Sequence, residues 1–372
     1  MRLPLRALPY LTFLLPFDLL VALCLCVSIP LCFRKHRGTE PQRPVAFATT
    51  IIIVNWDGKH LLTECLPSVI EAVEYDGRAH EILLVDNGST DGSVQFVREN
   101  FPGVRILPLD RNYGFAGGNN RGIAGVATDI VVLLNNDMIV DRGFIGPLLD
   151  GFSDPSVFAV TSQIFFYDST RRREEAGKTR ARFERGFFYL WHDDFQPGQQ
   201  TSEAIPVFWA GGGSCAIDRK KYVALGGFDS LYHPFYLEDT DLSYQAWKRG
   251  WKCLLAPASR VIHKHRSTSK TKFGEEFVEN TVRKNQYLFL WKNLTDVSLV
   301  LQHLVNLPRI HVGAMLNHAP SFEIRAFFRA CRQLPEALRA RVRSASHYTL
   351  SDHEVLVRSQ KSAVGNEPAN TK

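Results

Sequence analysis

The chain has 372 residues, of which 45% are hydrophobic, so it can bury a large core and is not a disordered protein. Its net charge of +6 suits an anionic partner such as nucleic acid, a phospholipid surface or a diphosphate-bearing substrate, and charge alone does not choose among them. The seven cysteines include no CxxC pair, and three lie in an N-terminal apolar stretch. This pattern argues against a zinc site or a disulfide framework and fits reduced thiols in a cytosolic domain.

The first element is an apolar stretch over residues 11–33, interrupted by Asp18 and a few small polar residues. Its length matches a hydrocarbon core of about 30 Å, and the basic residues 34–37 that follow it are expected to stay in the cytoplasm. We therefore expect a single-pass anchor that holds the protein at the cytoplasmic face of the inner membrane. A shallow interfacial helix is the alternative, because Arg2 and Arg6 flank the other end.

Four short β-rich runs bounded by turn residues come next, over 49–56, 81–87, 104–109 and 129–137. They are almost continuously apolar, which is typical of strands buried on both faces. Helical patterns lie between them, and this alternation predicts an α/β fold with a doubly wound, mostly parallel sheet. Ligands of such sheets bind at the carboxyl ends of the strands.

Polar residues stand at the ends of the first two strands. Asn55 and Asp57 follow the first strand, and Asp86 and Asn87 follow the second. A base such as uracil needs a group that accepts its imide proton, and Asp86 is our candidate. The alternative is that this second segment, DNGSTDGS, is only an Asx turn followed by a helix cap.

The segment 111–123, RNYGFAGGNNRGI, places glycines and asparagines at the mouth of a predicted helix. Glycines allow backbone amides to approach a diphosphate, which makes Gly117 and Asn119 candidates for nucleotide-sugar contact. The segment is not a Walker loop, and no dinucleotide fingerprint follows the first strand.

The fourth strand ends in Asn135, Asn136 and Asp137. Mg²⁺ and Mn²⁺ prefer oxygen ligands and often bind through one or two carboxylates plus substrate phosphates, so Asp137 is a candidate metal ligand. A polar residue that merely closes a strand is the alternative. His263 ends a later strand-like run beside a basic cluster, and a neutral imidazole there could complete a divalent-metal site.

Three carboxylates, Glu238, Asp239 and Asp241, crowd the start of a predicted helix. Acidic residues are favoured at helix starts by the helix dipole, so a purely structural role is one interpretation. The other is catalytic, because neighbouring carboxylates raise one another's pKa toward that of a useful base.

The ordered set NWDG, DNGSTDGS, RNYGFAGGNNRG, LLNND, GGGSCAIDRKKYVALGGFD, LEDTDLSYQAWKRGW and VIHKH resembles glycosyltransferase family 2, which has the GT-A fold. The resemblance covers about residues 46–269 and is strongest to bacterial, rhamnosyltransferase-like members with an N-x-D motif. Asn135 stands where the family often has its first Asp.

The resemblance implies a role for each candidate residue. It implies nucleotide-sugar contact by Asn55, Asp57, Asp86, Asn87, Gly117, Asn119, Asn135 and Asn136; metal binding by Asp137 with His263 or His265; catalysis by Asp239 as base beside Glu238; and acceptor contact by Trp209, Gly212, Gly213 and Asp241. It also implies an inverting, non-processive transfer that uses Mg²⁺ or Mn²⁺. The Q-x-x-R-W motif of processive synthases is missing from the sequence.

The expected organisation follows from these segments. We expect an anchor over 1–33, a basic linker over 34–45, a catalytic domain with a nucleotide-sugar half (46–141) and an acceptor half (142–270), amphipathic helices over 271–345, and a disordered tail over 346–372. The arginine-rich C-terminal helices could contact an anionic membrane or pack on the catalytic domain. Residues 168–203 match no motif.

The expected donor is dTDP-rhamnose or a UDP-sugar. The expected acceptor is a polyprenyl-diphosphate-linked glycan of cell-envelope polysaccharide synthesis, with a soluble glycan or a protein as the alternative. A catalytically silent member of the fold that only binds nucleotide-sugar or glycan is a second hypothesis. A sugar nucleotidyltransferase or a dehydrogenase is disfavoured, because the required glycine-rich loop does not follow the first strand.

Overall fold

The computed structural model describes residues 8–32, 48–167, 177–195, 202–264 and 272–360. Its strands are β1 (Thr49–Asn55), β2 (Glu81–Asp86), β3 (Arg105–Pro108), β4 (Ile130–Asn135), β5 (Met138–Val140), β6 (Val157–Phe166), β7 (Thr179–Glu184), β8 (Phe187–His192), β9 (Ile205–Pro206), β10 (Ser214–Asp218) and β11 (Lys252–His263). Its helices are α1 (Leu8–Cys32), α2 (Lys59–Asp76), α3 (Ser93–Asn100), α4 (Gly114–Ala124), α5 (Ile145–Asp150), α6 (Arg219–Leu225), α7 (Glu238–Lys248), α9 (Glu275–Asn293), α10 (Val297–Asn317), α11 (Pro320–Arg332), α12 (Leu334–Ala345) and α13 (Asp352–Arg358).

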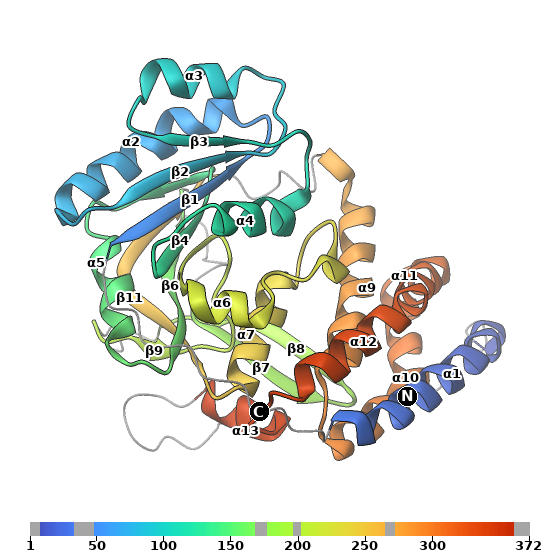
Figure 1. The fold of residues 1–372 in the computed structure, drawn as a ribbon. Coiled ribbons are helices and arrows are strands. Elements are labelled where there is room, and N and C mark those ends of the chain that lie inside the picture. The colour runs from blue at the N-terminus through green and yellow to red at the C-terminus, as the bar shows by residue number, and fades with distance from the viewer. Residues whose placement is uncertain (1–7, 33–47, 168–176, 196–201, 265–271, 361–372) are drawn as a thin grey trace.

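One sheet forms the centre of the molecule, in the order β3-β2-β1-β4-β10-β6-β11-β5, with β9 beside β11 (Figure 1). Strands β1, β2, β3, β4, β6 and β11 run in one direction, and β5, β9 and β10 run in the other. The predicted α/β, mostly parallel sheet is confirmed. Strand β10 is an antiparallel insertion between β4 and β6 that marks the change from the first half of the sheet to the second.

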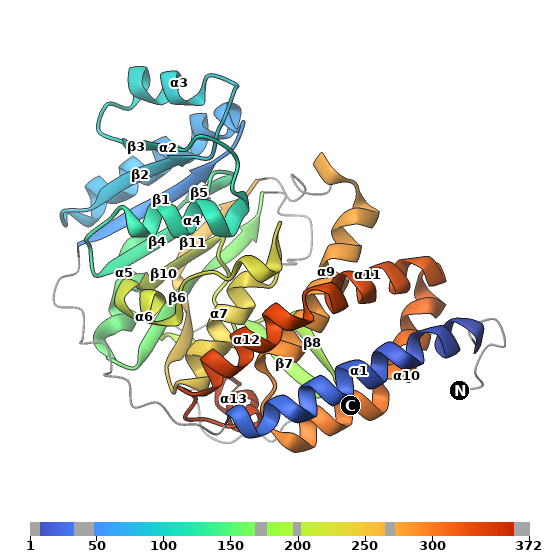
Figure 2. The same ribbon diagram turned by 45° about the vertical axis from the view of Figure 1, so that its right-hand side comes forward.

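Alternate residues of each strand pack into two separate hydrophobic cores, one on each face of the sheet, because successive side chains of a strand point to opposite faces. On β1, Ile51 and Ile53 pack with α2, α3 and α5, whereas Ile52 packs with α4 on the opposite face. The second core continues through α6 and α7 into the C-terminal helices, where α9 lies at the centre and packs against α11 and α12. Figure 2 shows these helices and α1 gathered on one side of the sheet.

The predicted disordered tail over 346–372 is wrong for its described part. Residues 346–360 are placed, and α13 begins with a capping box between Ser351 and Glu354. Asp352 is fully buried and bonds Lys248 and Tyr244 of α7 at 2.7 and 2.6 Å. A polar segment is therefore ordered by partners on a distant helix. The remainder of the predicted tail lies outside the described residues.

The predicted N-terminal span corresponds to α1. Pro9–Cys32 is the one described helix that is long and apolar enough to cross a membrane, a property that signal sequences and the core helices of soluble proteins share. In the structure α1 packs against α10, α11 and α12.

Candidate active site

A pocket of about 1150 Å³ opens where the carboxyl ends of the parallel strands meet. The register pairs Asn55 with Asp86 and Val54 with Asn135, so the ends of β1, β2 and β4 lie at the same level. The pocket is also lined by the glycine loop before β10, by the start of α7 and by the end of β11. This is the edge of the sheet at which the sequence predicts a ligand site.

The segment after β1 forms one wall of this pocket. Trp56 and Asp57 line it, and the left-handed backbone of Asp57 (φ 50°) turns the chain there. Asp57 accepts a hydrogen bond from the backbone N–H of Thr90 at 2.8 Å, which joins the segments that follow β1 and β2. Asn87 also lines the pocket, as do Asn135 and Asn136, so four of the predicted nucleotide-contacting residues are at its surface.

Asn55 and Asp86 lie behind this wall. Asn55 is fully buried, and its side-chain oxygen accepts a hydrogen bond from Asn136, a pocket residue, at 2.8 Å. Asp86 accepts a hydrogen bond from the backbone N–H of Ser89 through Oδ2, whereas its buried Oδ1 has no hydrogen-bond partner among the described residues. Neither Asn55 nor Asp86 lines the pocket itself. An unpaired buried acceptor is costly, so the Oδ1 of Asp86 has capacity for a donor group of a ligand that reaches it.

Gly117 and Asn119, which the sequence predicts as nucleotide-sugar contacts, do not line the pocket. The glycines of α4 serve close packing instead. A Cβ on Gly118 would meet Val54 at 2.8 Å, and one on Gly122 would meet Val85 at the same distance. Asn119 is buried and donates within α4 to the carbonyl of Phe115. Small residues there let α4 lie directly on β1 and β2.

Asp137 and His263 meet across the antiparallel pairing of β5 with β11. His263 Nε2 lies 3.1 Å from Asp137 Oδ2, and both side chains are about 10% exposed to the pocket. The buried Oδ1 of Asp137 has no hydrogen-bond partner among the described residues. The two predicted ligands are therefore brought together, and His265 lies outside the described residues.

This pair fits a hard divalent cation that takes its other ligands from elsewhere. Within the described part of the chain, no group of three or more His, Cys, Asp or Glu side chains could hold a metal ion. Mg²⁺ and Mn²⁺ commonly bind through few protein ligands and complete their shells with phosphate oxygens and water. One carboxylate and one imidazole at the rim of a large pocket match that behaviour.

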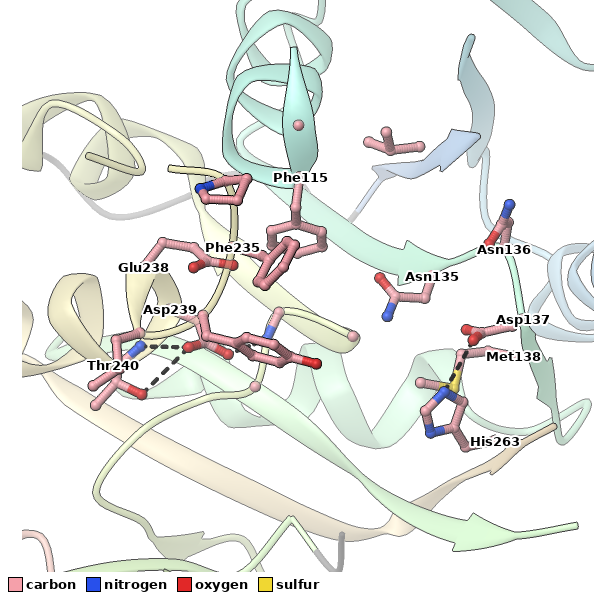
Figure 3. Close-up of a pocket in the computed structure, with 18 of the residues that line it drawn as sticks. Phe115, Asn135, Asn136, Asp137, Met138, Phe235, Glu238, Asp239, Thr240 and His263 are labelled. Atoms are coloured by element: carbon pink, nitrogen blue, oxygen red, sulfur yellow. Dashed lines mark hydrogen bonds and ion pairs between the residues drawn. The ribbon is translucent and has the colours of Figure 1, made fainter. Parts of the chain in front are cut away.

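Glu238 and Asp239 lie across the pocket from this pair, with Asn135 between the two groups (Figure 3). Asp239 accepts hydrogen bonds from the backbone N–H groups of Gly212 at 3.0 Å and Thr240 at 2.7 Å. Burial raises the pKa of Asp239, and it raises the pKa of Glu238 to about 8, with the Asp239 charge adding to the effect. Neutral pH therefore favours the protonated form of Glu238.

Three of the four predicted acceptor residues line the pocket and one does not. Trp209, Gly212 and Gly213 line the pocket, and a Cβ on Gly212 would meet Phe115 at 2.8 Å, so this loop requires glycine. Asp241 does not line the pocket, which corrects that prediction. It is fully buried, and Lys292 bonds it at 2.7 Å within a polar cluster beneath the pocket.

Several pocket residues carry no sequence signal. Thr179, Leu190 and His192 come from the β7–β8 hairpin, part of the unassigned stretch 168–203, and Thr179 Oγ1 bonds both the N–H and the C=O of Trp209. No sequence pattern indicates the support of the loop before α7 either. Asn285 of α9 donates to the carbonyls of Tyr232, Phe235 and Tyr236, which fixes a backbone that is left-handed at Tyr236 and Leu237.

Part of the chain matches a known protein family. The model of Glycosyl transferase family 2 matches residues 50–225, which include the strand ends, the N-x-D segment and the glycine loop. Residues 50–225 form a glycosyl transferase family 2 domain. The chain is therefore a glycosyltransferase, and the carboxylates of α7 and the end of β11 lie beyond the matched range.

One relative is the N-acetylglucosaminyl-diphospho-decaprenol L-rhamnosyltransferase of Mycobacterium tuberculosis, 29% identical over 261 residues that cover 64% of this chain and 83% of the relative. In sequence the chain thus resembles a rhamnosyltransferase of the family. Among solved structures, GalNAc-T7 with UDP, GalNAc and Mn²⁺ superposes with a TM-score of 0.54 at 18% identity, over 87% of this chain and 63% of that one. S. aureus TarS 1–349 with UDP-GlcNAc gives 0.52 at 11% identity, over 80% of this chain and 89% of that one. These likenesses establish the GT-A fold.

Proposed function

We propose that this glycosyltransferase moves one sugar from a nucleotide-diphosphate sugar to an acceptor hydroxyl, with inversion and with the help of Mg²⁺ or Mn²⁺. The observation that supports it best is the placement of two chemical groups in one pocket: Asp137 with His263 on one side, and Glu238 with Asp239 on the other. A diphosphate bound near the first group would point its sugar toward the second.

Asp239 is the proposed base. Its Oδ2 is held by the Gly212 N–H, so the carboxylate is fixed against the glycine loop that faces the acceptor side. In the proposed step Asp239 takes the proton of the acceptor hydroxyl, and that oxygen forms a bond to the anomeric carbon. The bond from the anomeric carbon to the diphosphate breaks, and the nucleotide diphosphate leaves with the electron pair. Attack opposite the leaving group inverts the configuration.

Asp137 and His263 are the proposed metal ligands. A bound divalent cation supplies neutralisation of the charge that develops on the departing diphosphate. Asp86 is the proposed acceptor for the base of the nucleotide, because its Oδ1 is buried and has no other partner among the described residues. Asn55 acts indirectly, by orienting Asn136 at the pocket surface.

We propose dTDP-rhamnose or a UDP-sugar as the donor and a polyprenyl-diphosphate-linked glycan of the cell envelope as the acceptor. The relative from M. tuberculosis is named for rhamnosyl transfer to a decaprenyl-diphosphate-linked N-acetylglucosamine, which supports this choice. We place the protein at the cytoplasmic face of the membrane, attached through α1. The domain limits expected from the sequence, 46–270 for catalysis and 271–345 for the helices, belong to the same proposal.

A screen of purified protein against common nucleotide-sugars tests the donor half of the proposal without an acceptor. Binding and slow hydrolysis are measured with Mn²⁺, with Mg²⁺ and with EDTA. Metal-dependent binding of one donor supports the proposal and identifies the sugar. Folded protein that binds no donor in any condition would contradict it, and binding without hydrolysis or transfer to any acceptor would favour the silent, binding-only alternative.

A further inference from the structure

Helix α1 contacts the rest of the protein through one narrow stripe. Its buried side chains are Leu14, Asp18, Val21, Leu25, Ser28 and Cys32. They recur every three or four residues along most of the helix, which is the spacing of a single helix face. This face packs against α10, α11 and α12, so α1 lies lengthwise along the C-terminal helices (Figure 2).

A buried polar chain fixes the middle of this contact. Asp18 is the only charged residue of α1, and its Oδ1 lies 3.0 Å from His311 Nε2. His311 Nδ1 lies 2.8 Å from Glu323, which in turn bonds Arg283 of α9 at 2.8 Å. His311 and Glu323 are fully buried. Asp18 therefore has its partner in the protein only while α1 stays docked.

A membrane-crossing α1 would conflict with this packing in two ways. Asp18 lies near the middle of the helix. A charged residue at that depth raises the free energy of membrane insertion by several times the thermal energy. The partner helices are also too polar to accompany it, since α11 carries Arg325 and Arg329 and α12 carries Arg339 and Arg341. A crossing helix would have to leave the docked position.

The outward surface of α1 is apolar along its whole described length. Its exposed large side chains are Tyr10, Phe13, Leu15, Leu19, Leu20, Leu23, Val27 and Leu31, with exposures of 39–63%. Beside it, α10 exposes Leu301 and Val305, the latter at 79%. An apolar patch of this extent is unusual on the surface of a soluble protein, and it indicates a contact with lipid or with another protein.

The charges that flank α1 in the sequence favour lipid. Arg2 and Arg6 precede the helix, and Arg34, Lys35 and Arg37 follow it. A crossing helix would place these two groups on opposite sides of the membrane, against the usual bias of basic residues toward the cytoplasm. A helix lying in the plane of one leaflet places both groups at the same layer of anionic headgroups.

We infer that α1 and the exposed side of α10 form a membrane-contact surface that lies in the plane of one leaflet, and that Asp18 holds α1 to the protein in this position. The surface would bring the C-terminal helices, and with them the pocket, to the layer in which a lipid-linked substrate resides. The inference concerns how the protein sits on the membrane and does not depend on the identity of donor or acceptor.

Sedimentation with vesicles of phosphatidylcholine and phosphatidylglycerol tests the surface. The full chain should co-sediment, and Leu19→Glu combined with Leu23→Glu should weaken binding by about a hundredfold, because each change removes the insertion of a leucine side chain. Val223→Glu is the matched control, since Val223 is 60% exposed on α6, far from α1, whereas Leu19 is 63% exposed. Thermal unfolding checks that all three proteins fold. Equal vesicle binding by the control and the double variant would overturn the inference. A stable soluble dimer that does not bind vesicles would also overturn it.

A topology measurement separates an in-plane helix from a crossing one. Epitope tags are placed at the N- and C-termini of the full chain, and spheroplasts of the expressing cells are treated with protease before and after lysis. An in-plane α1 keeps both tags on the same side, so both are cut only after lysis. Cleavage of the N-terminal tag in intact spheroplasts would show that α1 crosses the bilayer and would overturn the inference. Neither result depends on sugar transfer, so failure here is distinct from failure of the proposed function.

Discussion

The carboxylates on the two sides of helix α7 differ in how completely they are hydrogen-bonded. On the pocket side, Asp239 is held by two backbone N–H groups, and the Oε2 of Glu238 has no hydrogen-bond partner among the described residues. On the buried side, Asp241 accepts hydrogen bonds from four side chains, those of Tyr232, Gln245, Lys292 and Asn293. Residues two apart on a helix face different directions. A carboxylate with every lone pair used is a structural element, whereas one with spare capacity in a pocket can take a proton.

The largest expected effect of this difference is on catalysis. Asp239→Asn keeps the size of the side chain and removes its ability to accept a proton, so we expect the transfer rate to fall by about a thousandfold. Donor affinity, measured by calorimetry in Mn²⁺, should stay within about twofold, and thermal unfolding should show a folded protein. Normal turnover by this variant would contradict the assignment of Asp239 as base.

On the other side of α7 the expected effect is on folding. Asp241→Ala leaves the buried Lys292 ammonium with Asp229 as its remaining carboxylate, and we expect a loss of about 3 kcal/mol in the free energy of unfolding. Glu276→Ala is the matched control, because Glu276 pairs with Arg325 on the surface, and exposed ion pairs contribute about 0–1 kcal/mol. Chemical denaturation measures both. Equal losses in the two variants would show that the buried cluster does not stabilise α7.

A smaller effect is expected at the other end of the pocket. Asp137→Ala should abolish the gain in donor affinity that Mn²⁺ gives over EDTA, a gain we expect to be about tenfold or ~1.4 kcal/mol. Affinity in EDTA should be unchanged, which makes the chelator the internal control. A variant that still responds to Mn²⁺ as the unmodified protein does would remove Asp137 from the proposed ligands.

The parts of the site that could be predicted are those encoded by neighbouring residues. Apolar runs followed by polar residues located the ends of β1, β2 and β4, and these contribute Asp57, Asn135 and Asp137 to the pocket. The glycines of α4 are ambiguous in the sequence, because a glycine near a helix start suits close packing on a sheet as well as an approach to a ligand. The structure shows the packing role for Gly118, where a Cβ would meet Val54 at 2.8 Å.

The parts that could not be predicted depend on contacts between distant residues. Asn285 supports the pocket loop from about fifty residues away, and an asparagine inside a helix carries no pattern that indicates this. The β7–β8 hairpin reaches the pocket because Thr179 bonds Trp209. Asp352 orders the tail because it meets Lys248, a residue more than one hundred positions earlier. In each case the determining partner is set by the tertiary fold.

A gradual effect, spread over several pH units, is expected for Glu238. Burial raises the pKa of Glu238 from 4.5 to about 8, so between these values the folded state holds a proton that the unfolded state has released. The stability that this group contributes is fully present below about pH 4.5 and is lost as pH rises toward 8. Glu238→Gln cannot titrate. Relative to the unmodified protein it should therefore gain up to about 1.4 kcal/mol per pH unit across this window in denaturation measurements. A difference between the two proteins that stays constant with pH would mean that Glu238 is ionised in the folded state, and that the pocket side of α7 holds two negative charges in place of one.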